Sequence, residues 1–182
     1  MVGSASRDKY FAAAWELLTE QGFKQLTMTA LHRHLDVSSG SFYHFFRGWD
    51  DFVGQFLANW MEQTADISTA AQQASDPFDR LQILRVLART VPHAAEAAMR
   101  SWAAADPVVA EAQRHIDGQR LAIIRQSVAA VGIDGQVADR LAQHGLSVIV
   151  GWQQLSRPFD VAALDAMLGQ FIDLLHGYAA QP

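Results

Sequence analysis

Apolar residues recur along this chain at spacings of three and four, the pattern of helices that bury one face. Phe11, Trp15 and Leu18 form one such stripe, and Leu31 and Leu35 form another. No segment alternates apolar and polar residues as a half-buried strand would, and we find no repeat or low-complexity tract. The pattern predicts an all-α protein.

Capping and turn residues divide the pattern into about nine helices. Asp76 and Asp106 each precede a proline, the order expected of an N-cap followed by the first helical residue. Gly22 is a natural helix stop, and Gly132 and Gly135 flank a turn. The predicted helices cover residues 7–22, 28–35, 39–46, 50–74, 77–90, 92–104, 107–131, 135–155 and 160–178.

The second and third predicted helices are short and are joined by a tight turn. Each carries an apolar pair four residues apart, Leu31 with Leu35 and Phe42 with Phe46. Asp36 stands where the chain reverses, and aspartate tolerates the left-handed conformation better than most residues. This arrangement predicts a helix-turn-helix whose phenylalanines face a small core.

The opposite face of the third predicted helix collects small polar residues and two planar hydrogen-bonding side chains. These are Ser39, Gly40, Ser41, Tyr43 and His44. The major groove of B-DNA is wide enough for a helix presented in this way, and a glycine allows close approach of the backbone. Two helix caps belong to the same region, Thr27 before the second helix and Ser38 or Ser39 before the third.

The segment LTMTALHRHLDVSSGSFYHFFRGWDDF closely resembles the DNA-binding signature of the TetR/AcrR family of bacterial transcriptional regulators. The match runs from about Tyr10 to Leu57, and its specific parts are the Thr27 cap, Val37-Ser-Ser-Gly and the Phe42-Tyr43…Phe46 spacing. The resemblance implies an all-helical homodimer that represses promoters and is released by a small molecule. Family members typically place the residue at Tyr43 on a phosphate. The candidate DNA-binding residues are Thr27, Thr29, Ser38, Ser39, Gly40, Ser41, Tyr43, His44 and Arg47.

Charge changes this picture in one respect. The net charge is −5, yet residues 1–50 carry five basic and five acidic side chains, so the whole deficit lies in the remainder. The third predicted helix has no arginine or lysine, and Gly48-Trp49-Asp50 stands where family members commonly have a lysine. The phosphate-neutralising part of DNA affinity should therefore be modest, with a shallow salt dependence. We expect a DNA-binding domain over residues 1–48 and a ligand-binding and dimerisation domain over residues 49–182.

The second part is rich in bulky apolar side chains on several helices, which suits either ordinary packing or an adaptable apolar cavity. The family resemblance favours the cavity. His115 and Asp117 have the wrong spacing for a firm acid–base pair, and the histidines lack metal-ligand spacing, so we expect neither an enzyme nor a metal or cofactor site. The candidate pocket residues are Phe56, Trp60, Met61, Leu84, Leu87, Met99, Trp102, His115 and Ile116.

The last two predicted helices, in residues 145–155 and 164–179, are apolar over wide arcs. Gly145, Gly151 and Gly169 would permit close helix approach. Pairing of two such hairpins would make a four-helix interface between subunits, whereas the alternative is deeper burial within one subunit. The candidate interface residues are Leu146, Ile149, Trp152, Leu164, Leu168, Phe171 and Leu175.

The chain has no cysteine, no N-terminal signal-peptide pattern and no apolar run of about 20 residues, so we expect a cytoplasmic protein without membrane contact. The expected partners are double-stranded DNA with a palindromic operator, a second copy of the chain and a small apolar or amphipathic effector. The alternative is a helical small-molecule-binding protein without specific DNA recognition, which the scarcity of basic residues on the third helix would explain.

Overall fold

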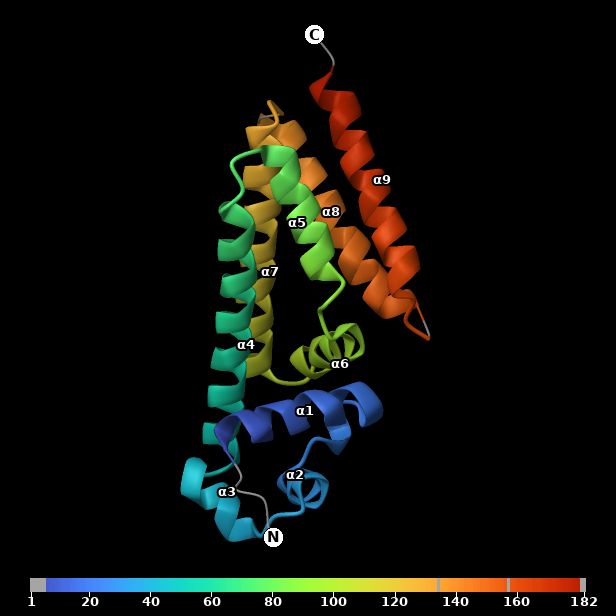
Figure 1. The fold of residues 1–182 in the computed structure, drawn as a ribbon. Coiled ribbons are helices and arrows are strands. Elements are labelled where there is room, and N and C mark those ends of the chain that lie inside the picture. The colour runs from blue at the N-terminus through green and yellow to red at the C-terminus, as the bar shows by residue number, and fades with distance from the viewer. Residues whose placement is uncertain (1–5, 134, 157, 181–182) are drawn as a thin grey trace. The chain divides into compact units, whose positions relative to one another are not determined.

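The computed structural model describes residues 6–133, 135–156 and 158–180. These residues form nine α-helices, one short 3-10 helix (η1) and no strand (Figure 1), which confirms the predicted all-α fold. The predicted helix bounds agree within two residues, and only η1 was not predicted. The elements are α1 Arg7–Gln21, η1 Phe23–Gln25, α2 Met28–Leu35, α3 Ser39–Phe45, α4 Trp49–Gln72, α5 Pro77–Ala88, α6 His93–Ala103, α7 Pro107–Ala130, α8 Gly135–Leu155 and α9 Val161–Ala179.

Side-chain caps begin several of these helices, as the sequence predicts. The Thr27 hydroxyl accepts a hydrogen bond of 3.2 Å from the Ala30 N–H at the start of α2. The Asp76 and Asp106 carboxylates accept bonds from the first turns of α5 and α7. Ser38 occupies the N-cap position of α3, but its side chain makes no capping hydrogen bond, so the predicted hydroxyl cap is not formed there.

The chain divides into two compact units. Unit 1 contains Met1–Met61 and Pro92–Gln113, and unit 2 contains Glu62–Val91 and Arg114–Pro182. Unit 1 thus joins α1, η1, α2 and α3 to α6 and to the first part of α4. This division follows compactness and differs from a boundary between residues 48 and 49. That boundary, which separates a DNA-binding part from the remainder, stays a prediction.

Unit 1 is built around aromatic side chains from α1, α3 and α4. The Tyr10 ring lies 5.6 Å from Phe42 and 5.5 Å from Phe46, both edge to face. Phe46 in turn contacts Phe52 on α4, with ring centroids 5.1 Å apart. α1 also packs against α2, η1 and α6. Tyr10 is fully buried and contacts both phenylalanines, so α1 fixes the position of α3.

Unit 2 has a separate aliphatic core on α5, α7, α8 and α9. In this unit α9 packs against both α5 and α8. The Phe171 ring of α9 packs directly against the backbone of α8 at Gly145. A Cβ at residue 145 would lie only 2.9 Å from that ring. The core residues are Leu81, Ile124, Val128, Ile133, Ala138, Leu141, Ala142, Leu146, Phe171, Ile172 and Leu175.

Candidate nucleic-acid interface

The turn between α2 and α3 has the left-handed residue that the sequence predicts. Asp36 has φ 51° and ψ 51°, and its N–H points back toward the last turn of α2. The Val37 N–H donates to the His32 carbonyl at 3.1 Å, which closes the turn. α3 then begins at Ser39 and ends at Phe45.

The two faces of α3 differ sharply in burial. Phe42 is completely buried, and Phe46, which follows the helix, is also buried. Between them, Tyr43 is 59% exposed, an unusual exposure for so large an apolar ring. His44 is exposed beside it, and its ring contacts Phe45 edge to face. The phenylalanines therefore hold the helix, and the tyrosine and histidine face outward.

The predicted contact residues lie around this outward face. Ser39 and Gly40 are exposed at the start of α3, Ser41 is half-buried, and Thr29 is exposed on α2. A Cβ on Gly40 would meet only the Ser38 hydroxyl, at an ordinary 3.8 Å. The fold itself therefore does not require glycine at this position.

A polar contact links α2 to α1. His34 Nε2 lies 2.5 Å from Glu16 Oε2, and both residues belong to unit 1. The His32 ring of α2 contacts Phe42 edge to face at 5.7 Å. His34 and His32 therefore anchor α2 to α1 and to Phe42 of α3, and neither histidine was assigned a structural role from the sequence.

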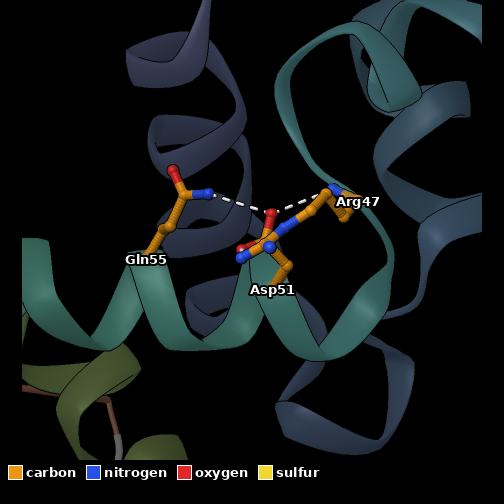
Figure 2. A network of polar contacts seen from close by, with 3 residues as sticks. All are labelled: Arg47, Asp51 and Gln55. Carbon is orange, nitrogen blue, oxygen red and sulfur yellow. Dashed lines mark hydrogen bonds and ion pairs between the residues drawn. The ribbon is translucent and has the colours of Figure 1, made fainter.

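Arg47 follows α3 and is held by the first turns of α4 (Figure 2). Asp51 Oδ2 accepts one hydrogen bond of 2.9 Å from the Arg47 backbone N–H and another of 3.0 Å from Gln55 Nε2. Asp51 Oδ1 lies 3.3 Å from Arg47 Nη2. The bond from the Arg47 backbone N–H is the largest cause that holds the pKa of Asp51 below its usual range. The carboxylate is therefore charged, and the Arg47 side chain remains 93% exposed.

This network was missed in the sequence analysis, which assigned Arg47 alone. A signal was present, because Asp51 is the third residue of α4, the position from which an acidic side chain reaches back to cap a helix start. The capping box in its usual form has a serine or threonine at the N-cap, and here Gly48 stands there. Because Gly48 has no side-chain hydroxyl, the sequence does not show a complete capping box.

The nine predicted pocket residues divide between the two units. In unit 1, Phe56 and Trp60 pack against Trp15 with ring centroids 4.9 and 5.8 Å apart, and Trp102 stacks on Phe23. Met99 is buried and Met61 half-buried. In unit 2, Ile116 is buried, whereas Leu84 and Leu87 are half-buried and His115 is exposed. Their role as a pocket lining stays a prediction.

The predicted interface residues are mostly covered within one chain. Ile149 and Trp152 are half-buried, and the Trp152 indole N–H donates to the Asp160 carbonyl at 2.9 Å. The other five are buried inside unit 2, and these are Leu146, Leu164, Leu168, Phe171 and Leu175. The large apolar side chains that remain exposed on α8 and α9 were not assigned from the sequence, and these are Leu155, Val161, Leu174 and Tyr178.

The part of the chain with described coordinates contains no group of three or more acidic or histidine side chains that could hold a metal ion. Among the same residues, no helix is both long enough and apolar enough to cross a membrane.

Comparison with known proteins identifies the same region. Residues 11–55 match the family model of the N-terminal domain of bacterial regulatory proteins, tetR family. That stretch contains α2, α3, Arg47 and Asp51. No curated protein sequence matches the chain.

Solved structures share the fold over nearly the whole chain. A transcriptional regulator from Rhodococcus sp. Rha1 superposes with a TM-score of 0.78 at 19% identity, covering 98% of this chain and 100% of its own. A TetR transcription regulator from Haloarcula marismortui gives 0.76 at 18% identity, covering 92% and 96%. A proposed transcriptional regulator from Saccharomonospora viridis in complex with choline gives 0.76 at 18%, covering 92% and 95%. Residues 11–55 therefore match the tetR family of bacterial regulatory proteins, and the chain shares the fold of these solved regulators.

Proposed function

We propose that this DNA-binding transcriptional regulator acts as a homodimeric repressor that places α3 of each subunit in the major groove of a palindromic operator. The observation that carries the proposal is the division of α3 into two faces. Phe42 is buried against α1, and Tyr43 and His44 are exposed on the opposite side. A helix anchored by one face and polar on the other is suited to read base edges in a groove.

The exposed residues would divide their roles by chemistry. Tyr43 and Arg47, which carry a hydroxyl and a cation on long side chains, would contact phosphates and set the position of the domain. Ser41 and His44 also lie on α3 and would contact base edges. Thr27 is already engaged as a helix cap through its hydroxyl, so its contribution would come mainly from holding α2.

Dimerisation would use the last two helices. Leu174 and Tyr178 are exposed on one face of α9, and Leu155 is 83% exposed at the end of α8. Exposed large apolar side chains on two packed helices favour pairing with a second copy of the same hairpin. The half-buried Ile149 and Trp152 would extend this surface. A dimer also gives two copies of α3, which a palindromic operator requires.

A small apolar or amphipathic effector would bind within residues 49–182 and release the DNA. Support comes from the bulky apolar side chains there, and from buried polar groups such as Glu96, whose carboxylate accepts a bond of 3.4 Å from the Trp60 indole. The similar regulator from Saccharomonospora viridis was solved in complex with choline, which supports the proposal of a small organic effector. The effector would have to bind the DNA-competent and DNA-incompetent conformations unequally, with α4 transmitting the difference.

The test is selection of bound sequences from a random DNA pool at near-physiological salt. Enrichment of an inverted repeat is expected, with half-sites about one helical turn apart. A folded, dimeric sample that enriches no sequence would contradict the proposal.

That negative outcome would favour a helical small-molecule-binding protein without specific DNA recognition. The observation behind this second candidate is that α3 carries no lysine or arginine, so the general phosphate term is small. A matched assay separates the two functions, because a thermal shift with candidate effectors would persist in either case, whereas sequence enrichment belongs only to the regulator.

A further inference from the structure

The start of α4 carries more negative than positive charge at the edge of the proposed DNA-binding face. Arg47 is followed by Asp50 and Asp51 in the first turn of the helix. Asp50 is exposed, and Asp51 is directly paired with Arg47. The segment that follows α3 therefore presents no net positive charge to DNA, although Arg47 itself is almost fully exposed.

The geometry of the pair shows which of its bonds are firm. Asp51 Oδ2 is engaged by two well-formed bonds, one from the Arg47 backbone N–H at 2.9 Å and one from Gln55 at 3.0 Å (Figure 2). The contact between Oδ1 and the Arg47 guanidinium is longer, at 3.3 Å. The carboxylate is thus fixed in place by the backbone and by Gln55, whereas the guanidinium is loosely held and retains donors for another acceptor.

The fixed Asp51 carboxylate offsets the positive charge of Arg47, while the Arg47 side chain stays exposed. DNA affinity gains a sequence-independent contribution for each phosphate that a cation neutralises. A carboxylate at hydrogen-bond distance from that cation reduces the gain, because the guanidinium must weaken this ion pair when it binds a phosphate. The pKa of Asp51 is lowered, so the carboxylate keeps its charge near neutral pH.

We propose that Asp51 sets the sequence-independent part of DNA affinity by offsetting the charge of Arg47. The inference rests on the proposed function, because it assumes that Arg47 faces a phosphate. It gives Asp51 a role beyond capping α4. A small phosphate term leaves selection to the base contacts of α3, and it leaves less free energy for an effector to overcome when DNA is released.

The experiment compares Asp51→Asn with Asp50→Asn, each alone and together with Arg47→Gln. Asparagine keeps a carbonyl oxygen for the Arg47 N–H, so the helix start is retained while the charge is removed. Asp50→Asn is the matched control, since this substitution removes the same negative charge one residue away from Asp51. Affinity is measured by fluorescence anisotropy from about 50 to about 200 mM salt. The probes are the selected inverted repeat and a duplex of equal length and scrambled sequence.

Asp51→Asn is expected to bind both duplexes several-fold more tightly and to steepen the salt slope by up to about 0.9 for each Arg47 in the complex. Adding Arg47→Gln should abolish this gain for Asp51→Asn but leave any gain from Asp50→Asn in place. An unchanged or weaker affinity of Asp51→Asn would overturn the inference, as would a gain that persists without Arg47.

Arg47→Gln alone keeps the inference testable if Asp51→Asn does not fold, because the Arg47 side chain is exposed. In the otherwise unchanged chain it should reduce the salt slope by clearly less than 0.9 per subunit. A reduction of the full amount would show that Asp51 offsets nothing. The preference of the unchanged chain for the inverted repeat tests the proposed function separately, so the two failures are distinguishable.

Discussion

The Arg85 guanidinium on α5 donates two parallel hydrogen bonds to the Asp165 carboxylate on α9. Nε lies 2.9 Å from Oδ1 and Nη2 lies 2.7 Å from Oδ2, and both side chains are about three-quarters covered. Gly169, one turn along α9, faces the same guanidinium, and a Cβ there would lie 3.1 Å from Nη1. Near the other end of α5, the Phe78 ring stacks on His176 at 3.7 Å. These two contacts fix α5 against α9 within unit 2.

The ion pair should make the stability of unit 2 depend on pH. The hydrogen bond from Arg85 is the largest cause that lowers the pKa of Asp165. A lowered carboxyl pKa contributes stability that is fully present above the unfolded value of about 3.9. That contribution is lost as pH falls through the lowered folded-state pKa. Asp165→Asn should therefore reduce the thermal midpoint by a few degrees at neutral pH.

Thermal unfolding of both proteins between neutral pH and pH 3 checks this expectation. The difference between their midpoints should shrink toward acid pH, because the unchanged chain then loses the charge that the variant never had. A difference that stays constant down to pH 3 would show that the carboxylate contributes through shape and not through charge.

Gly145 should be intolerant of even a methyl group. A Cβ at this position would lie 2.9 Å from two carbon atoms of the buried Phe171 ring and 3.5 Å from Ile124. Overpacking of this kind costs roughly 1–3 kcal/mol, because the ring or a helix must shift. Gly145→Ala should lower the free energy of unfolding by that amount in a denaturant titration. Gly151→Ala in the same helix is the matched control, since no atom lies within 4 Å of its Cβ position, and it should be neutral or stabilising.

Local signals made the helices and the turn predictable. Asp76 and Asp106 cap their helices, and Asp36 adopts the left-handed conformation, because capping and turn chemistry depend on residues adjacent in sequence. The two faces of α3 followed from the spacing of Phe42 and Phe46 for the same reason. The outward face of α3 was thus largely predictable from residue spacing alone.

The partners of apolar side chains were not predictable in this way. Leu164 and Leu175 lie on an apolar arc that suited a subunit interface, yet both are completely covered within one chain. Gly145 was expected to allow close approach, and it does so toward Phe171 in its own unit. Which of two apolar surfaces a side chain meets depends on helix packing across many residues, and periodicity alone carries no such information.

Leu174 tests the proposed subunit interface. It is 40% exposed on α9, one residue before the buried Leu175, so a polar replacement should leave unit 2 folded. Leu174→Glu should weaken the dimer by roughly tenfold or more, because burial of an unpaired carboxylate costs several kcal/mol. Size-exclusion chromatography with light scattering over a dilution series measures the change. Val86→Glu, on an exposed apolar residue of α5, is the control and should leave the mass unchanged.

Tyr43 and Ser41 should affect DNA binding in different ways. Tyr43→Phe removes only the hydroxyl of an exposed ring and should reduce affinity for all sequences by a similar factor, roughly three- to tenfold for one lost hydrogen bond. Ser41→Ala should instead change the preferred bases at one position in each half-site. Repeating the random-pool selection with each variant distinguishes them. A changed motif for Tyr43→Phe would move that residue to the base edges.

Gly40→Ala should have opposite effects on the stability of the free protein and on its affinity for DNA. Space is available beside it, since a Cβ would meet only the Ser38 hydroxyl at 3.8 Å. A glycine within a helix costs about 0.5–1 kcal/mol relative to alanine, so Gly40→Ala should raise the stability of the free protein by up to that amount. If the backbone of α3 approaches DNA closely here, the same change should weaken operator binding by roughly tenfold, equivalent to about 1.4 kcal/mol.

A gain in protein stability together with a loss of operator affinity would show that glycine at residue 40 serves DNA binding and not the fold. Gly118→Ala is the control, because that glycine lies in α7 with no atom within 4 Å of its Cβ position. It should raise the thermal midpoint without changing operator affinity. If Gly40→Ala also stabilised the protein and left affinity intact, the backbone at residue 40 would not be in contact with DNA. The outward face of α3 would then begin its contacts at Ser41, and the helix would lie with its middle, not its start, nearest the groove floor.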